Sequence, residues 1–146
     1  MNKKADAFQK YLDADENKKT AFQREEVKDD TQKTVVFRSH IVVEGQQLPT
    51  LVILDDSVFS MIRIQVSPQA KTEENELKVL KMVNEFNLKY KPFKLYFDAA
   101  GSLILDVCLL TPGEDFSELG DEIYGMFDVL INFLNESYRP IMKEIW

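Results

Sequence analysis

The chain has 146 residues, of which 45% are hydrophobic, so it is long enough and apolar enough to form one folded domain. Its formal net charge of −7 argues against binding to nucleic-acid phosphates, and its single cysteine excludes an internal disulfide. No apolar segment follows the first lysines, and no run approaches the roughly 18 apolar residues that span a bilayer, so we expect a soluble, cytoplasmic protein.

Residues 1–33 differ from the rest in composition, because eight basic residues balance eight acidic ones and large apolar residues are few. Phe8, Tyr11 and Leu12 have the spacing of one helical face, which predicts a short helix over roughly residues 5–15. A helix of this length is marginal alone, so we expect it to be docked and the following charged linker to be weakly ordered. Both segments are assigned to the same domain as residues 34–146.

The hydrophobic period changes to two from residue 34, which predicts three antiparallel strands joined by short turns. The first strand is expected to end near Glu44, and the others to cover 48–54 and 58–66. In the third strand, we expect a set of alternate residues to face the core: Ile62, Ile64 and Val66.

A period near 3.6 then predicts a helix that is capped by Thr72 and runs to about Lys89. Apolar and polar residues alternate again on both sides of a turn that ends at Gly101. The pattern predicts a second hairpin, with strands over 93–97 and 103–109.

The last helix is expected to follow a capping box formed by Asp115 and Glu118. Pro140 is expected to kink this helix or to end it. The complete order is therefore α-β-β-β-α-β-β-α. We predict an α+β fold in which helices cover a five-stranded antiparallel sheet.

One stretch carries a resemblance to a known family. Val83-Asn84-Glu85-Phe86-Asn87 is followed by Phe93 and then by Phe97-Asp98-x-x-Gly101 and an alternating strand. This order resembles the YbjN-type bacterial domain, and the whole arrangement of residues 35–146 resembles the fold of type III secretion chaperones. The resemblance implies a homodimer or a protein-binding module with no shared active site. Its motif residues are Asn84, Asn87 and Gly101, and we expect the two asparagines to tie the helix to the hairpin.

The residues that usually carry chemistry are sparse. His40 is the only histidine and is expected on an exposed strand face, while Cys108 is expected to be a small filler within its strand. A catalytic pair would require His40 to reach the Cys108 thiol. No glycine-rich phosphate loop or metal-ligand spacing is present. We therefore assign no catalytic residue, no metal and no cofactor.

The C-terminal helix has apolar residues over an arc too wide for one sheet-facing stripe. We expect either the N-terminal helix or a second subunit to cover the surplus, and we predict a homodimer to which this helix or the edge of the sheet contributes. The candidate protein-binding residues are Met126, Val129, Phe133, Tyr138 and Trp146. The acidic residues of this region are either a solvated face or a steering surface for a basic partner.

The leading hypothesis is a non-enzymatic interaction module, chaperone-like or regulatory, that binds a segment of another bacterial protein in extended or helical form. The alternative is a small-ligand-binding protein or enzyme. Its pocket would lie between the sheet and the C-terminal helix, with Tyr96, Asp106 and Cys108 on the wall. A structural subunit of a larger assembly is a third possibility.

Overall fold

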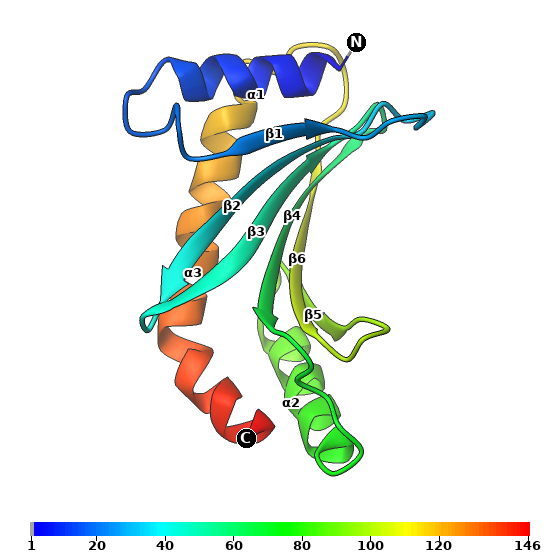
Figure 1. The fold of residues 1–146 in the computed structure, drawn as a ribbon, viewed down its shortest axis with the longest axis vertical. Coiled ribbons are helices and arrows are strands. Elements are labelled where there is room, and N and C mark those ends of the chain that lie inside the picture. Colours follow the sequence, from blue (N-terminus) through cyan, green and yellow to red (C-terminus); the bar gives the residue numbers. More distant parts are fainter. Residues whose placement is uncertain (1) are drawn as a thin grey trace.

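The computed structural model describes residues 2–146 and contains three helices and six strands. The helices are α1 (Lys3–Asp13), α2 (Glu76–Lys89) and α3 (Leu119–Ile145). The strands are β1 (Gln23–Glu26), β2 (Val35–Val43), β3 (Gln46–Leu54), β4 (Phe59–Ser67), β5 (Lys94–Phe97) and β6 (Leu103–Leu110). They form one antiparallel open sheet with the spatial order β1-β2-β3-β4-β6-β5 (Figure 1). The predicted α+β class and antiparallel sheet are confirmed.

The predicted number of strands is wrong, because the sheet has six strands rather than five. The additional strand, β1, lies in the segment expected to be a weakly ordered linker, and its sequence Gln-Arg-Glu-Glu has no hydrophobic alternation. It pairs antiparallel with β2. On the core side, the Arg24 guanidinium lies 5.7 Å from the centre of the Phe37 ring and bonds to Asp6 at 3.0 Å. Tertiary contacts therefore stabilise a strand that intrinsic propensity does not specify.

All three helices pack on one face of the sheet. The core residues of the third predicted strand, Ile62, Ile64 and Val66, point to this face and are almost fully buried, as expected. Figure 1 shows α1 lying across one end of the sheet, α3 running along it and α2 at the opposite end. The other face of the sheet carries none of the described helices, and we call it the open face.

The N-terminal helix covers part of α3. Phe8 of α1 packs edge-on against Phe37 of β2, with ring centres 4.9 Å apart. Tyr11 lies against Gly120 at the start of α3, where an added Cβ would overlap the tyrosine ring. Helix α1 therefore covers the start of α3, whereas Val129 within the apolar surplus is 44% exposed. A second subunit as the other cover stays a prediction.

The helix boundaries differ from the predicted ones at two places. Thr72 and Asn75 bond reciprocally, since each side chain accepts the backbone N–H of the other, and the regular helix α2 begins after Asn75, at Glu76. Thr72 thus caps the entry turn, three residues before Asn75. Asp115 accepts the N–H of Ser117, and Glu118 makes no side-chain capping bond, so the predicted capping box is wrong.

Helix α3 continues through Pro140 to Ile145, so the proline does not end it. Figure 1 shows the last turns running in a different direction from the first ones, as expected where a proline removes a helical hydrogen bond. Ile141 and Ile145 are buried in the core beyond the proline, and this burial holds the segment in place. None of the helices described in residues 2–146 is long and apolar enough to cross a membrane.

Candidate protein-binding surface

The pairing register determines which side chains share the open face, because directly opposite residues of antiparallel strands point to the same side. Val36, Ile53, Met61 and Cys108 lie opposite one another across β2, β3, β4 and β6. Phe59 and Leu110 form the next pair along β4 and β6. Five of these residues make a continuous apolar surface, which we call the open-face patch: Ile53, Phe59, Met61, Cys108 and Leu110.

The open-face patch is accessible to solvent. Phe59 is 50% exposed and Leu110 is 67% exposed, and Cys108 is also exposed. Ile53 and Met61 are half-buried by their neighbours. Contiguous apolar side chains on a protein surface commonly mark the place where another molecule binds.

A polar network lies beside the patch on the same face. The Asp106 carboxylate is only 2% exposed and accepts two bonds from Arg63, from Nε at 2.9 Å and from a terminal nitrogen at 3.0 Å. The Tyr96 hydroxyl donates to the same carboxylate at 2.8 Å. The bonds to Asp106 raise the pKa of Arg63, and burial followed by the bond to Asp106 raises the pKa of Tyr96. The network connects β4, β5 and β6 and keeps a buried charge paired.

The pocket predicted for the alternative hypothesis is wrong in its location. Tyr96, Asp106 and Cys108 lie on the open face, whereas α3 packs on the opposite face of the sheet. Because alternate residues of β6 point to opposite sides, Leu103, Leu105 and Val107 are the residues that face the helices.

His40 is exposed, as expected, but it is not close to Cys108. The two residues lie on β2 and β6 with β3 and β4 between them, which places their strands roughly 14 Å apart. Cys108 is exposed, so the expectation that it acts as a small apolar filler is wrong. Within residues 2–146, no three His, Cys, Asp or Glu side chains converge on a common point where a metal ion could bind.

The predicted motif residues have three different surroundings. Asn87 accepts the N–H of Leu95 at 2.8 Å and donates to its carbonyl at 2.9 Å, so it ties α2 to the hairpin as expected. Asn84 is exposed and makes no side-chain bond within the described chain, so its expected tie is wrong. Gly101 has φ +80°, and a Cβ there would lie 3.0 Å from the Lys71 carbonyl oxygen.

The candidate residues of α3 do not form one surface. Phe133 is buried between α2 and the hairpin, where its ring centre lies 4.5 Å from that of Phe93. Met126 and Tyr138 are partly buried against the core. Val129 and Trp146 are exposed at separate positions along the helix. Phe133 is therefore not available to a partner, while a binding role for the others stays a prediction.

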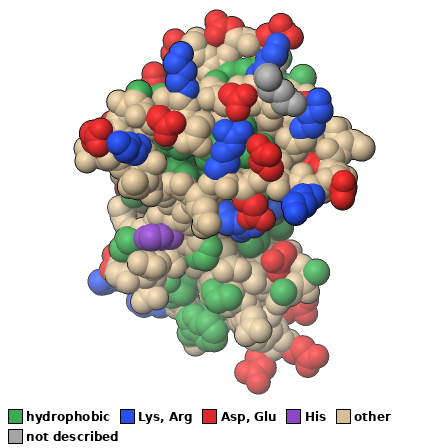
Figure 2. All heavy atoms as spheres, turned by 45° about the horizontal axis from the view of Figure 1, so that its top comes forward, with side chains coloured by type: hydrophobic (Ala, Val, Ile, Leu, Met, Phe, Trp, Pro, Cys, Tyr) green, Lys and Arg blue, Asp and Glu red, His purple; other side chains and the backbone are tan. Residues whose placement is uncertain are grey.

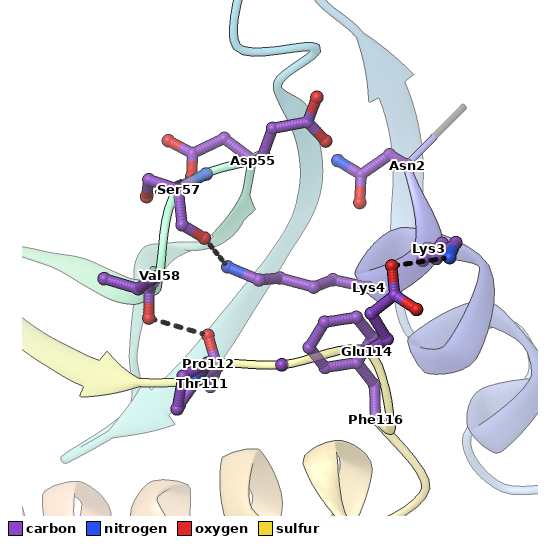
Figure 3. A pocket seen from close by; sticks show the side chains of 12 residues that line it. Asn2, Lys3, Lys4, Asp55, Ser57, Val58, Thr111, Pro112, Glu114 and Phe116 are labelled. Atoms are coloured by element: carbon purple, nitrogen blue, oxygen red, sulfur yellow. Dashed lines mark hydrogen bonds and ion pairs between the residues drawn. The ribbon is translucent and has the colours of Figure 1, made fainter.

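A cavity of about 270 Å³ lies at the start of α1, between the β3–β4 turn and the segment after β6 (Figure 3). Lys4 extends across it and is only 4% exposed. Its Nζ donates to the carbonyls of Ser57 at 2.6 Å and Phe59 at 2.8 Å. Burial lowers the pKa of Lys4, and the charges of Asp55 and Asp56 oppose that change. The ammonium group already serves to fasten α1 to the turn, so the cavity has no free cationic site at Lys4.

Charged side chains of both signs mingle over the end of the molecule formed by α1 (Figure 2). Lys3 lies 3.2 Å from Glu114, and Arg24 lies 3.0 Å from Asp6. The described side chains at this end therefore form no extended basic stripe. Nucleic-acid backbones require such a stripe.

The fold and the surface define an α+β protein whose antiparallel sheet has helices on one face and an apolar patch on the other. The sequence matches no protein-family model, and no curated protein shows significant similarity to it. The resemblance to YbjN-type domains therefore stays a prediction.

Proposed function

We propose that the chain is a non-enzymatic interaction module that binds a segment of another polypeptide on the open face. The observation that carries this proposal is the exposure of Phe59 and Leu110 beside Cys108, Met61 and Ile53, with none of the helices described in residues 2–146 over them. Covering such side chains releases water and contributes about 25 cal/mol for each Å² of apolar surface buried.

The charge of the open face supports the same partner class. Arg38, Arg63 and Lys94 lie in one row across the sheet with Asp106 between the last two, and Glu25 pairs with Arg38 at 2.7 Å. The face is thus close to neutral in a chain of net charge −7. A nearly neutral face with an apolar patch suits a polypeptide, and the resemblance to chaperone-like domains points in the same direction.

The test is a selection of binders from a library of random displayed peptides. Each selected peptide is then measured against wild type, Met61→Glu and the matched control Leu88→Glu, which places the same charge on an 86% exposed residue of α2. We expect binding to fall by about tenfold or more for Met61→Glu, because a buried unpaired carboxylate is costly, and to be unchanged for Leu88→Glu. Peptides that bind all three proteins equally would refute the proposal.

Self-association is measured on the same three proteins by sedimentation. If wild type and Leu88→Glu are dimers and Met61→Glu is a monomer, a second copy of the chain occupies the open face. The homodimer predicted from the sequence would then form through the open face, rather than through α3 or the edge of the sheet.

A further inference from the structure

The edge of the sheet formed by β5 and β6 is only half complete. Strand β5 pairs with the first half of β6, from Phe97 opposite Leu103 to Lys94 opposite Asp106. If β5 continued in the same register, Pro92 would lie opposite Cys108. A proline has no N–H to donate, so it is suited to end the ladder here. The second half of β6 therefore has β4 on one side and none of the described strands on the other.

Two flanking hydrogen bonds show which backbone groups face the vacant side. The N–H of Thr111 bonds to Val58, so the odd-numbered residues of β6 bond to β4. The N–H of Asp98 bonds to the carbonyl of Ser102, so the even-numbered residues point toward β5. By this alternation, the N–H and C=O groups of Cys108 and Leu110 point into the vacant position. No donor or acceptor in residues 2–146 is bonded to them there.

The corresponding outer edge of β5 is protected. Asn87 bonds to both the N–H and the C=O of Leu95, which are the groups that would otherwise receive an added strand. The edge of β5 is thus occupied by Asn87, whereas the edge of β6 at Cys108 and Leu110 is available to an added strand. The far edge, formed by β1 and by β2 beyond residue 38, also has no further strand within residues 2–146, but it lies at the other end of the row of strands, away from Cys108 and Leu110.

The side chains around the vacant stretch indicate what an added strand would carry. A residue opposite Cys108 or Leu110 would share the open face with them and contact the open-face patch. Leu110 also lines a small depression with three exposed carboxylates, from Asp115, Glu118 and Glu122. None of the three is in an ion pair within the described chain, and no basic side chain lines the depression.

We propose that an extended segment of a partner protein adds to β6 as a further strand at Cys108 and Leu110. The segment carries apolar residues at alternate positions and a flanking lysine or arginine that reaches Asp115, Glu118 and Glu122. This inference rests on the proposed function and specifies its partner. Main-chain bonds supply the attachment, the patch selects apolar side chains, and charge complementarity selects the basic residue.

The test uses a labelled ten-residue peptide that alternates valine with threonine and has lysine at both ends. A second peptide is N-methylated at the residues that would donate to β6, and a third has glutamate in place of lysine. Binding is followed by fluorescence anisotropy and by the rate at which a thiol reagent modifies Cys108, the only cysteine. We expect the first peptide to bind and slow the modification, and each altered peptide to bind about tenfold more weakly.

Two protein variants distinguish the contribution of the Leu110 backbone N–H to binding from that of its side chain. Leu110→Pro removes the outward N–H without touching a bond to β4, and Leu110→Ala keeps that N–H. We expect a loss of about tenfold for the proline variant and a smaller loss for the alanine variant. The double variant Glu118→Gln/Glu122→Gln should weaken binding several-fold and flatten its dependence on salt.

Equal binding of the N-methylated and unmodified peptides to wild type would overturn the inference, even if Leu110→Pro did not fold. No binding of the first peptide would overturn it as well. A third outcome is that selected peptides bind Met61→Glu more weakly, but their affinity is unchanged by N-methylation and by Leu110→Pro. The proposed function is then supported, and strand addition is refuted. If the library yields no peptide that depends on Met61, both proposals fail.

Discussion

Replacing Arg63 by methionine should destabilise the protein by leaving the Asp106 carboxylate buried without its cation. Asp106 is 2% exposed and keeps only the Tyr96 hydroxyl after the change. Removing one partner of a buried ion pair typically costs about 3–5 kcal/mol. Because the Arg63 side chain is 38% exposed, solvent screens part of the interaction, and we expect a loss of about 2–3 kcal/mol.

The double variant Arg63→Met/Asp106→Leu removes both charges and should be within about 1 kcal/mol of wild type, because apolar residues of similar volume can replace a buried pair. Asp106→Leu alone leaves a partly exposed arginine, which water can solvate, so its loss should be about 1 kcal/mol. Urea unfolding of all four proteins gives the free energy of unfolding and, through the cycle, a coupling energy of about 2 kcal/mol. A loss below about 0.5 kcal/mol for Arg63→Met, or a double variant as unstable as the sum of the single changes, would refute the reasoning.

The remaining predictions concern single contacts and are measured by the same unfolding assay. Gly120→Ala should lower the free energy of unfolding by about 1–3 kcal/mol, because the new methyl group overlaps the Tyr11 ring. The same change in a Tyr11→Ala background should have no such effect, and an equal loss there would contradict the contact. Asn87→Ala should cost about 1–3 kcal/mol by leaving backbone groups of β5 unpaired, whereas its exposed control Asn84→Ala should stay within about 0.5 kcal/mol. Tyr96 has a pKa above its usual 10.0, so the stability that its protonated hydroxyl contributes is present below pH 10 and is lost as the pH rises through the native value. The difference in free energy of unfolding between wild type and Tyr96→Phe should therefore become smaller above pH 10. A difference that does not change with pH would contradict the proposed contribution of the Tyr96 hydroxyl.

The two hydrophobic periods predicted most elements because each period is a local property. Alternation identified β2 to β4 and the hairpin of β5 and β6, and the 3.6-residue period identified the three helices. Helix ends were less well predicted. The burial of Ile141 and Ile145 carries α3 past Pro140, and that burial depends on distant parts of the chain.

The candidate surface was largely hidden from sequence reasoning. The sequence shows that Cys108 and Leu110 are out of phase with Leu103, Leu105 and Val107, but not which set faces the helices. It also cannot place Phe59 opposite Leu110, because these residues are far apart in the chain and only the β4–β6 register joins them. Lys4 likewise gave no signal, since its partners are backbone carbonyls.

Side-chain periodicity was enough to predict the class of fold, because this local pattern decides whether a segment forms a helix or a strand with one apolar side. The packing of distant segments, by contrast, adds Gln23–Glu26 to the sheet, places the described helices on one face, and ends β5 before Cys108. Each of these outcomes depends on pairing register and on contacts between distant segments, and no local pattern encodes them.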